Sequence, residues 1–365
     1  MNLDWIDLVG FRSYQQLRYE PAAGVNVLVG PNGAGKTNLL EAIGYLGMLK
    51  SFRAAPDGAL VSTSGDVAVI RGQVSSGDRR SLIEIEVPAN GRRRIQVNRQ
   101  RLARTADMLG HLRIVVFLPD DLDIIKRGPG LRRGFLDDLA VQLWPASYLD
   151  QQEYDKILRQ RNGLLRFHGR DADPTTLAVW NERLSQAGAK VMERRARACA
   201  SMREGADDAY RRLSSTDDAV RFGYESSWGG SLDPDEPLEG RRARLWAALE
   251  DADKDDRERR VTTRGPHRDE PVVLLGDRPS RTHASQGEQR SLILSMRLAS
   301  HDAIAEVVGE PPVLVLDDVF SELDIERARA LASALPTAQT FISTARFEEV
   351  PVEGTRFEVG RGGVA

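Results

Sequence analysis

The sequence predicts an α/β protein in which a lobe with a mixed sheet and antiparallel hairpins is split by a mainly helical second lobe. Near the start, an apolar strand at residues 25–29 runs into a glycine-rich loop and a helix. From about residue 130 to 213, apolar residues recur every three or four positions, as on one face of a helix. After residue 270, short apolar strands alternate with helical segments again. The same lobe therefore begins and ends the chain.

The length of 365 residues also implies more than one lobe, because single hydrophobic cores stop growing at roughly 250 to 300 residues. We expect the sheet lobe to comprise residues 1–115 and 251–365, and the helical lobe to comprise residues 116–250. Alternating apolar residues at 67–97, interrupted by the turn residues Asn90 and Gly91, predict antiparallel hairpins within the first part.

Composition excludes several classes of protein. Hydrophobic residues make up 41% and charged residues 29%, as in an ordinary folded protein. The net charge of −3 argues against nucleic-acid binding through overall charge, so any such contact needs a local basic surface. A single cysteine, Cys199, allows no internal disulfide and no cysteine-rich metal site, and we expect it to be a core residue. No apolar run is long enough to span a membrane and the first residues do not form a signal peptide, so we expect a cytoplasmic protein without a membrane partner.

The pattern GxxxxGK[ST], placed between the expected strand and helix, predicts a phosphate-binding loop. Its glycines let backbone N–H groups turn towards phosphate oxygens, Lys36 neutralises phosphate charge, and Thr37 holds Mg²⁺ through its hydroxyl. A glycine-rich turn that matches by chance would lack the flanking strand and helix. We expect the nucleotide to contact Gly30, Pro31, Asn32, Gly33, Ala34, Gly35, Lys36, Thr37 and Asn38.

A second motif lies far downstream and is acidic. The apolar strand at 313–316 is followed by Asp317 and Asp318. A buried parallel strand delivers the residue at its carboxyl end to the ligand crevice. We expect Asp317 to bind Mg²⁺ and Asp318 to polarise the attacking water, which makes Lys36, Asp317 and Asp318 the expected catalytic residues. The alternative is a surface acidic pair after a core strand.

A third motif comprises Ser285, Gln286, Gly287, Glu288 and Gln289, before a helical run. Its local chemistry is that of a capping box, in which Ser285 and Glu288 satisfy the first N–H groups of the helix. The motif precedes the strand at Val313 by 28 residues (313 − 285), and Ser321 to Asp324 follow that strand. We therefore weigh a nucleotide-binding role for Ser285, Gln286, Gly287 and Glu288 against simple capping.

Taken in order, these motifs resemble those of the ABC/SMC-type P-loop ATPases, and more closely the RecF family. Other stretches share that resemblance, although Glu270 departs from the last position of one of them: 11–14 (FRSY), 117–122 (FLPDDL), 132–137 (RRGFLD), 265–269 (GPHRD) and 319–324 (VFSELD). The resemblance covers nearly the whole chain, except that residues 170–240 carry no recognised motif.

The resemblance implies a slow, DNA-dependent ATPase that uses ATP and Mg²⁺. Two copies would sandwich two ATP molecules, with Ser285 of one copy on the γ-phosphate bound by the other, and with Arg12 and Asp324 near the nucleotide. It further implies that the ATP-driven homodimer clamps DNA at gaps or junctions between single and double strands. It would promote loading of the recombinase RecA with RecO and RecR, and hydrolysis would release the dimer. A position where related ATPases carry a sensor histidine holds Thr344 here.

Two clusters of positive charge could contact DNA phosphates. Residues 91–104 contain six arginines and no acidic residue, and the second cluster is Lys126, Arg127, Arg132 and Arg133. A solvated charged strand face is the plainer alternative. The run at 254–260 mixes both signs and predicts a salt-bridged helix surface instead.

Two other function classes stay open. A transporter ATPase subunit is disfavoured because Ser285 follows Lys36 by 249 residues (285 − 36), with a helical insertion between them. A binding module that uses ATP only to hold its dimer together, without hydrolysis, is the stronger alternative.

Overall fold

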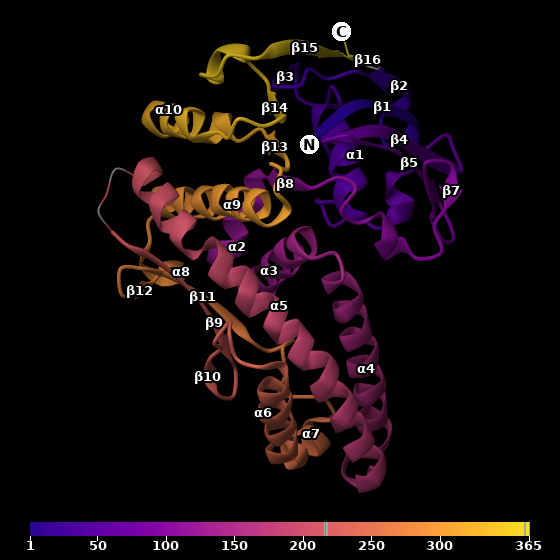
Figure 1. Ribbon diagram of the computed structural model, residues 1–365, viewed down its shortest axis with the longest axis vertical. Coiled ribbons are helices and arrows are strands. Elements are labelled where there is room, and N and C mark those ends of the chain that lie inside the picture. Colours follow the sequence, from indigo (N-terminus) through magenta and orange to yellow (C-terminus); the bar gives the residue numbers. More distant parts are fainter. Residues whose placement is uncertain (215, 217, 361–362, 365) are drawn as a thin grey trace. The chain divides into compact units, whose positions relative to one another are not determined.

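The computed structural model describes residues 1–214, 216, 218–360 and 363–364. These form two compact units, each with its own core (Figure 1). The first unit comprises residues 1–122, 208–217 and 290–365, and the second comprises residues 123–207 and 218–289.

The first unit contains a six-stranded sheet that is parallel except at one edge (Figure 1). Its strands, in spatial order, are β16 (Gly363–Val364), β15 (Thr355–Gly360), β3 (Val25–Val29), β14 (Thr340–Thr344), β13 (Val313–Asp317) and β8 (Ile114–Phe117). Every residue of β13 and β14 is buried, as expected of central parallel strands that are covered on both faces. The carboxyl ends of β3, β13 and β14 meet at one edge of this sheet.

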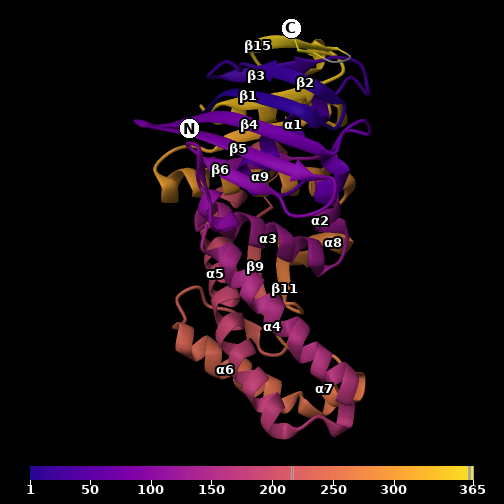
Figure 2. The same ribbon diagram turned by 90° about the vertical axis from the view of Figure 1, so that its right-hand side faces the viewer.

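The second sheet of this unit is antiparallel, and Figure 2 shows its strands side by side. In spatial order they are β2 (Tyr14–Tyr19), β1 (Asn2–Phe11), β4 (Val67–Ser76), β5 (Arg79–Pro88), β6 (Arg94–Val97) and β7 (Gln100–Arg101). The hairpins predicted from the alternating residues at 67–97 are confirmed by the β4–β5 and β5–β6 pairings.

Three long helices belong wholly or mainly to the first unit: α1 (Lys36–Met48), α9 (Gln286–Val308) and α10 (Ile325–Ala334). Helix α1 contacts strands of both sheets, including β1 and β13. This position explains why its apolar residues are not confined to one stripe, since Leu39, Leu40, Ile43 and Leu46 are all fully buried.

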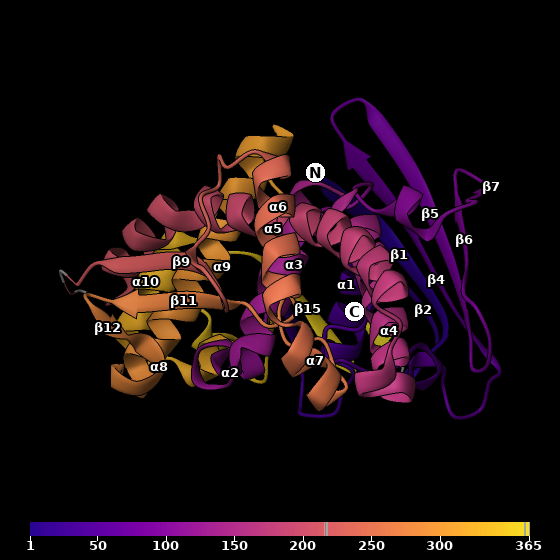
Figure 3. The same cartoon turned by 90° about the horizontal axis from the view of Figure 1, so that it is seen from below.

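The second unit is mainly helical, with a small antiparallel sheet. Its helices, whose residues 122 and 208–214 are assigned to the first unit, are α2 (Leu122–Lys126), α3 (Pro129–Leu143), α4 (Ser147–His168), α5 (Pro174–Ser214), α6 (Leu238–Asp251), α7 (Asp253–Arg259) and α8 (Ser280–His283). Its strands are β9 (Val220–Ser226), β10 (Gly230–Ser231), β11 (Glu270–Leu275) and β12 (Arg278–Pro279), and Figure 3 shows β9 beside β11. Short 3₁₀ turns across the whole chain are at 57–60, 105–108, 119–121, 169–171, 320–322 and 347–349.

Helix α5 buries the face that its sequence predicts. Leu177, Leu184, Ala187 and Val191 are each at most 2% exposed, whereas Trp180 is half-buried and Arg183 lies over its ring. Cys199 lies on the same helix and is buried, as expected of a core residue.

The two units end at residues different from those of the expected lobes. Residues 251–289 belong to the second unit because β11 pairs along its length with β9. Asp256 adds a fully buried ion pair with Arg161 of α4 at 2.7 Å. The boundary is therefore set by pairing between segments distant in sequence, which composition does not reveal.

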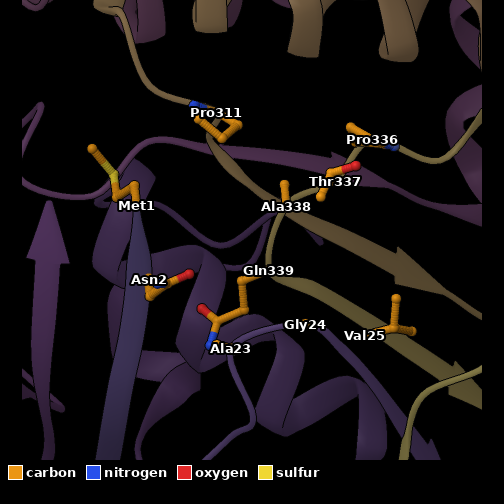
Figure 4. Close-up of a pocket in the computed structure, with 10 residues that line it drawn as sticks. All are labelled: Met1, Asn2, Ala23, Gly24, Val25, Pro311, Pro336, Thr337, Ala338 and Gln339. Carbon is orange, nitrogen blue, oxygen red and sulfur yellow. The ribbon is translucent and has the colours of Figure 1, made fainter. Parts of the chain in front are cut away.

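A pocket of about 360 Å³ opens at the edge of the parallel sheet formed by the amino ends of β3, β13 and β14 (Figure 4). Gln339 forms part of its wall, and the Gln339 amide is hydrogen-bonded to both backbone groups of Leu3 and to Ala22 O. Ligands of open α/β sheets bind at the opposite, carboxyl edge. The nucleotide is therefore expected at that other edge.

Among the residues that the structure describes, no helix is both long and apolar enough to cross a membrane.

Candidate nucleotide site

The loop at 30–35 follows β3 directly and leads into the first turn of α1. Gly33 and Gly35 have φ values of +80° and +114°, which side chains rarely adopt. A Cβ at Gly30 would lie 2.3 Å from Val359 O, and one at Gly35 would lie 2.8 Å from the Tyr14 hydroxyl. The loop thus has its shape because glycine stands at each of these positions.

Lys36 begins α1, and its ammonium group folds back over the loop. Its Nζ donates hydrogen bonds to Gly30 O at 2.6 Å and to Pro31 O at 3.1 Å. Burial lowers the pKa of Lys36, and the negative charges of Asp318 and Asp317 oppose this. The cation is therefore held where the loop curves, close to two carboxylates.

The remaining loop residues differ in exposure. Pro31, Asn32 and Gly33 are exposed, whereas Ala34 is buried. Asn38, in the first turn of α1, donates a hydrogen bond to Ser13 Oγ at 2.8 Å. The exposed part of the loop, with the free N–H groups of the helix start, forms a surface suited to an anion.

Asp317 ends β13 beside the first turn of α1. Its Oδ1 accepts hydrogen bonds from Thr37 Oγ1 at 3.0 Å and from Ser343 Oγ at 2.6 Å. Burial raises the pKa of Asp317, and the hydrogen bonds from Ser343 and Thr37 partly offset the rise. A carboxylate beside a threonine hydroxyl is an oxygen donor set that suits Mg²⁺, so these residues fit the expected metal.

Asp318 lies in an unusual backbone conformation with a φ of +52°. Its N–H donates to Ser343 Oγ at 2.9 Å, which fixes the turn at the end of β13. Within the described residues, its Oδ1 is buried and has no hydrogen-bond partner. An unpartnered buried carboxylate oxygen is costly, so its presence next to Asp317 and Lys36 indicates a functional position.

The turn between β1 and β2 packs against α1 through Arg12 and Tyr14. The Arg12 guanidinium forms two hydrogen bonds of 2.8 Å with the fully buried Glu41 carboxylate and a third with Ala59 O. The Tyr14 hydroxyl donates to Gly35 O at 3.1 Å, and burial raises the pKa of Tyr14 to about 12. Arg12 thus binds α1 through two of its nitrogens and the turn at 57–60 through the third.

The motif at 285–289 forms the capping box that its sequence predicts. Ser285 N donates to Glu288 Oε2 at 2.6 Å, and Glu288 N donates to Ser285 Oγ at 3.3 Å. Ser285 and Gln286 are exposed, and Gly287 follows in the first turn of α9. This motif belongs to the second unit, whereas the phosphate loop belongs to the first.

After Asp318, the chain leads through a short turn to Asp324. Asp324 caps α10 by accepting a hydrogen bond from Arg327 N at 2.9 Å. Glu322 in the same turn is bound by Arg290 of α9, through its backbone oxygen at 2.6 Å and its carboxylate at 3.1 Å. The structure thus gives Asp324 a capping role, and its expected contact with nucleotide stays a prediction.

Sequence reasoning missed two residues of this site, Ser343 and Tyr14. The strand end at 340–344 drew attention to Thr344 instead. Thr344 is buried and donates its hydroxyl proton to Arg346 O at 2.9 Å or to Glu349, while its neighbour Ser343 binds Asp317. The adjacent hydroxyls Ser343 and Thr344 at the end of an apolar strand were the available signal. Tyr14 was present only as part of the FRSY stretch.

Comparisons with known proteins agree with this geometry. A family model described as RecF/RecN/SMC N terminal domain matches residues 2–354. The DNA replication and repair protein RecF of Streptomyces avermitilis is 40% identical over 374 residues, which cover 100% of this chain and 99% of that protein. The RecF protein of Acidothermus cellulolyticus is 38% identical, with 98% of each chain covered.

Solved structures show the same fold. The recombination mediator protein RecF-ATP in the RecFOR pathway superposes with a TM-score of 0.91 at 32% identity, covering 100% of this chain and 96% of that chain. The SmcHead bound to the C-winged helix domain of ScpA superposes with a TM-score of 0.56 at 18% identity, covering 100% of this chain and 96% of that chain. The fold is thus that of the ABC/SMC-type ATPases, and the chain belongs to the RecF family of DNA replication and repair proteins.

Proposed function

We propose that this chain is a cytoplasmic, ATP-dependent DNA-binding protein of recombinational repair and replication-fork maintenance. ATP and Mg²⁺ drive two copies into a dimer that clamps gapped DNA or junctions between single and double strands. Slow, DNA-dependent hydrolysis releases the dimer. In this role the protein cooperates with RecO and RecR to load the recombinase RecA, as the RecFOR pathway named for its structural relatives suggests.

The hydrogen bond between Thr37 and Asp317 carries this proposal. It joins the end of the phosphate loop to the end of β13, so one hydroxyl and one carboxylate oxygen lie 3.0 Å apart beside Lys36. Thr37 and Asp317 would hold Mg²⁺ there, and the ion would neutralise developing phosphate charge. Lys36 would turn from the carbonyl oxygens of Gly30 and Pro31 to the β- and γ-phosphates.

Asp318 is the residue that we assign to water activation. Its buried Oδ1 has free lone pairs, and Ser343 holds the turn that presents it. Aspartate is one methylene shorter than the glutamate found at this position in many relatives, and Thr344 replaces the sensor histidine. Both features favour slow turnover, which suits a switch.

Completion of the site by a second copy is supported by the state of Ser285. Its Oγ accepts a hydrogen bond from Glu288 N, so the hydroxyl proton stays available for a phosphate oxygen. Ser285 and Gln286 are exposed at the start of α9, where the helix dipole favours an anion. ATP would therefore act as a ligand between two copies, and mass action makes their association depend on ATP.

The arginine-rich hairpin at 91–104 is the surface that we assign to DNA. Arg93 is used internally, through Tyr45 and Leu49, and Arg94 pairs with Glu86. Within the described residues, the other four are exposed and have no ion-pair partner: Arg92, Arg99, Arg101 and Arg104. Such side chains can bind phosphates without reading the base sequence.

The second basic cluster is largely structural. Arg132 is buried and binds Pro271 O and Glu270, Arg133 donates to Asp269 O, and Arg127 pairs with Asp123. The bonds of Arg132 and Arg133 hold α3 against β11 and the chain leading into it, whereas the pair of Arg127 with Asp123 is local to α2 and its end. The interpretation of this cluster as a DNA surface is therefore not supported.

Binding of a labelled gapped duplex, measured with and without Mg-ATP, tests the proposal. Wild type should bind more tightly with ATP, and DNA should stimulate its hydrolysis. Lys36→Met should lose both effects, whereas the exposed Lys156→Met, which makes the same charge change in α4, should keep them. Equal DNA binding with and without ATP would refute the proposal. ATP-dependent binding without any hydrolysis would favour the module that uses ATP only to hold its dimer.

A further inference from the structure

A pocket of about 320 Å³ in the second unit is walled by three arginines: Arg259, Arg264 and Arg268. The rest of its lining is Ser227, Val261 and Thr263, so no carboxylate lines it. Arg259 ends α7, and Arg264 and Arg268 lie on the chain that leads from α7 into β11. Ser227 follows β9, which lies beside β11 (Figure 3).

These arginines lack the acidic partners that Arg257, Arg170 and Arg242 of the same unit have. Arg264 donates a hydrogen bond to Ser227 O at 3.3 Å. Within the residues that the structure describes, the side chains of Arg259 and Arg268 form no hydrogen bond or ion pair, and none of the three side chains contacts a carboxylate. The expected salt-bridged surface at 254–260 is therefore realised for Arg257 with Asp253, but not for Arg259.

A larger pocket of the same unit shows the usual arrangement. About 740 Å³ in volume, it has both Lys190 and Arg242 in its wall. Lys190 lies 3.5 Å from the Glu153 carboxylate, and Arg242 lies 2.7 Å from that of Glu182. The smaller pocket is thus unusual in collecting positive charge without compensation.

The chain that carries the arginines is fixed by buried interactions. Thr263 donates two hydrogen bonds to Asp256 Oδ1, at 2.8 and 2.6 Å, and Asp256 is itself paired with the buried Arg161. Arg195 holds the same chain farther along, through a hydrogen bond of 2.6 Å to Pro266 O. Like charges repel one another, so this cluster persists because the backbone beneath it is firmly anchored.

The chemistry of the pocket selects phosphate. Guanidinium groups bind phosphate oxygens in pairs of parallel hydrogen bonds. Among the described residues, Val261 is the only apolar side chain in the lining, so these residues form no apolar groove for a peptide. Arg259 and Arg268 are exposed, so a polymer on the surface can reach them with one backbone phosphate.

We propose that Arg259, Arg264 and Arg268 form a binding pocket for a phosphodiester group of a DNA strand. The inference rests on the proposed DNA binding and adds a contact on the second unit, separate from the arginine-rich hairpin. It makes this pocket a backbone contact that positions DNA without reading sequence.

The test compares two triple variants of the full-length chain. The pocket variant replaces Arg259, Arg264 and Arg268 by glutamine. The control variant replaces three arginines of the same unit that have carboxylate partners, and it removes the same charge: Arg170, Arg221 and Arg242. Affinity for a labelled gapped duplex is measured with Mg-ATP between about 50 and 200 mM KCl, and thermal melting verifies folding.

The pocket variant should bind DNA on the order of tenfold more weakly, with a salt slope reduced by about 2 to 3. The control should keep the wild-type slope, and both variants should keep ATP-dependent self-association. Should the pocket variant misfold, Arg268→Gln replaces it, because that exposed side chain makes no bond, and its slope should fall by about 1.

The inference would be overturned if the salt slope of DNA binding were equal for the pocket variant and the wild type. It would also be overturned if both triple variants lost the same DNA affinity. Binding of inorganic pyrophosphate is measured for the same variants. If the pocket variant lost pyrophosphate binding but kept the wild-type salt slope for DNA, the pocket would be assigned to free phosphate. If the pocket variant lost binding of oligoglutamate but kept the wild-type salt slope for DNA, the pocket would be assigned to an acidic protein segment. Either result would overturn the DNA contact while leaving the proposed function intact. Absence of DNA binding by wild type would instead refute the proposed function.

Discussion

Thr37 and Asp317 are separated by 280 residues in the sequence, and the Thr37 hydroxyl donates a hydrogen bond of 3.0 Å to Asp317 Oδ1. Asp317 ends β13, and Thr37 lies in the first turn of α1, after the loop that follows β3. The bond joins them because β3 and β13 end at the same edge of the parallel sheet. Both oxygens lie beside Lys36. A metal ion at this place would bind both oxygens and replace the hydrogen bond between them.

Asp317→Asn should remove the effect of Mg²⁺ on ATP binding. The amide keeps the size of the side chain and still accepts from Thr37, but it lacks the negative charge that attracts the ion. ATP affinity measured by calorimetry, with and without Mg²⁺, should differ for wild type and not for this variant. Ser343→Ala removes the hydrogen bond that Ser343 Oγ donates to Asp317 and the one that it accepts from Asp318 N, but it keeps both carboxylates, so it should preserve most of the Mg²⁺ effect. A full Mg²⁺ effect in Asp317→Asn would place the metal elsewhere.

Asp318→Asn should separate ATP binding from hydrolysis. The variant loses the basic carboxylate, and general bases contribute about 10²- to 10⁴-fold to rate. ATP-dependent dimerisation should remain and persist longer, while phosphate release in the presence of DNA should fall by at least about 100-fold. An unchanged hydrolysis rate would exclude Asp318 as the base.

Glu41→Ala should strongly destabilise the first unit. Glu41 is fully buried, and its loss leaves the Arg12 guanidinium without its anion, which costs about 3 to 5 kcal/mol when such a pair is broken. Glu84→Ala, which removes an exposed pair with Arg71, should cost no more than about 1 kcal/mol. Urea unfolding of both variants measures the difference. Equal, small losses would show that the Arg12–Glu41 pair adds little.

The second unit contains two buried groups whose effects on stability oppose each other with pH. Burial raises the pKa of Asp269 to about 6, so the folded state binds its proton first and this contribution to stability falls as pH rises from about 4 to about 6. Burial lowers the pKa of His267 to about 4, so the unfolded state binds its proton first and this contribution falls as pH decreases from about 6.5 to about 4.

Replacing either residue should therefore leave only the pH dependence of stability that the other residue causes. In His267→Gln, the free energy of unfolding should rise on acidification from about pH 6 to pH 4, by up to about 1.4 kcal/mol per pH unit. In Asp269→Asn, it should fall over the same range. Urea unfolding at a series of pH values measures both. If the free energy of unfolding changed with pH in the same direction in both variants, the opposite pKa shifts of Asp269 and His267 would be contradicted.

Much of this site follows from local sequence, and the rest depends on tertiary pairing. The glycines of the phosphate loop and the capping box of Ser285 act within a few residues, so their patterns predict them. Ser343 reaches Asp317 only because β14 lies next to β13, and no local pattern states which strands are neighbours.

Buried charge is the other limit of sequence reasoning. Arg132 and Arg133 look like a surface cluster, yet they hold β11 and the chain leading into it. Asp256 lies in a run of mixed charges and is nevertheless fully buried against Arg161. A charged residue shows its environment only when its partner is known, and here the partners lie 95 to 139 residues away.

Sedimentation velocity with Mg-ATP tests most directly the central claim that ATP joins two copies through a shared site. Wild type should shift from monomer to dimer, whereas Lys36→Met and Ser285→Arg should each remain monomeric. A mixture of these two variants should form dimers again, because one of its two sites combines an intact phosphate loop with an intact Ser285. Dimerisation of Ser285→Arg alone, or a mixture that stays monomeric while wild type dimerises, would contradict the account.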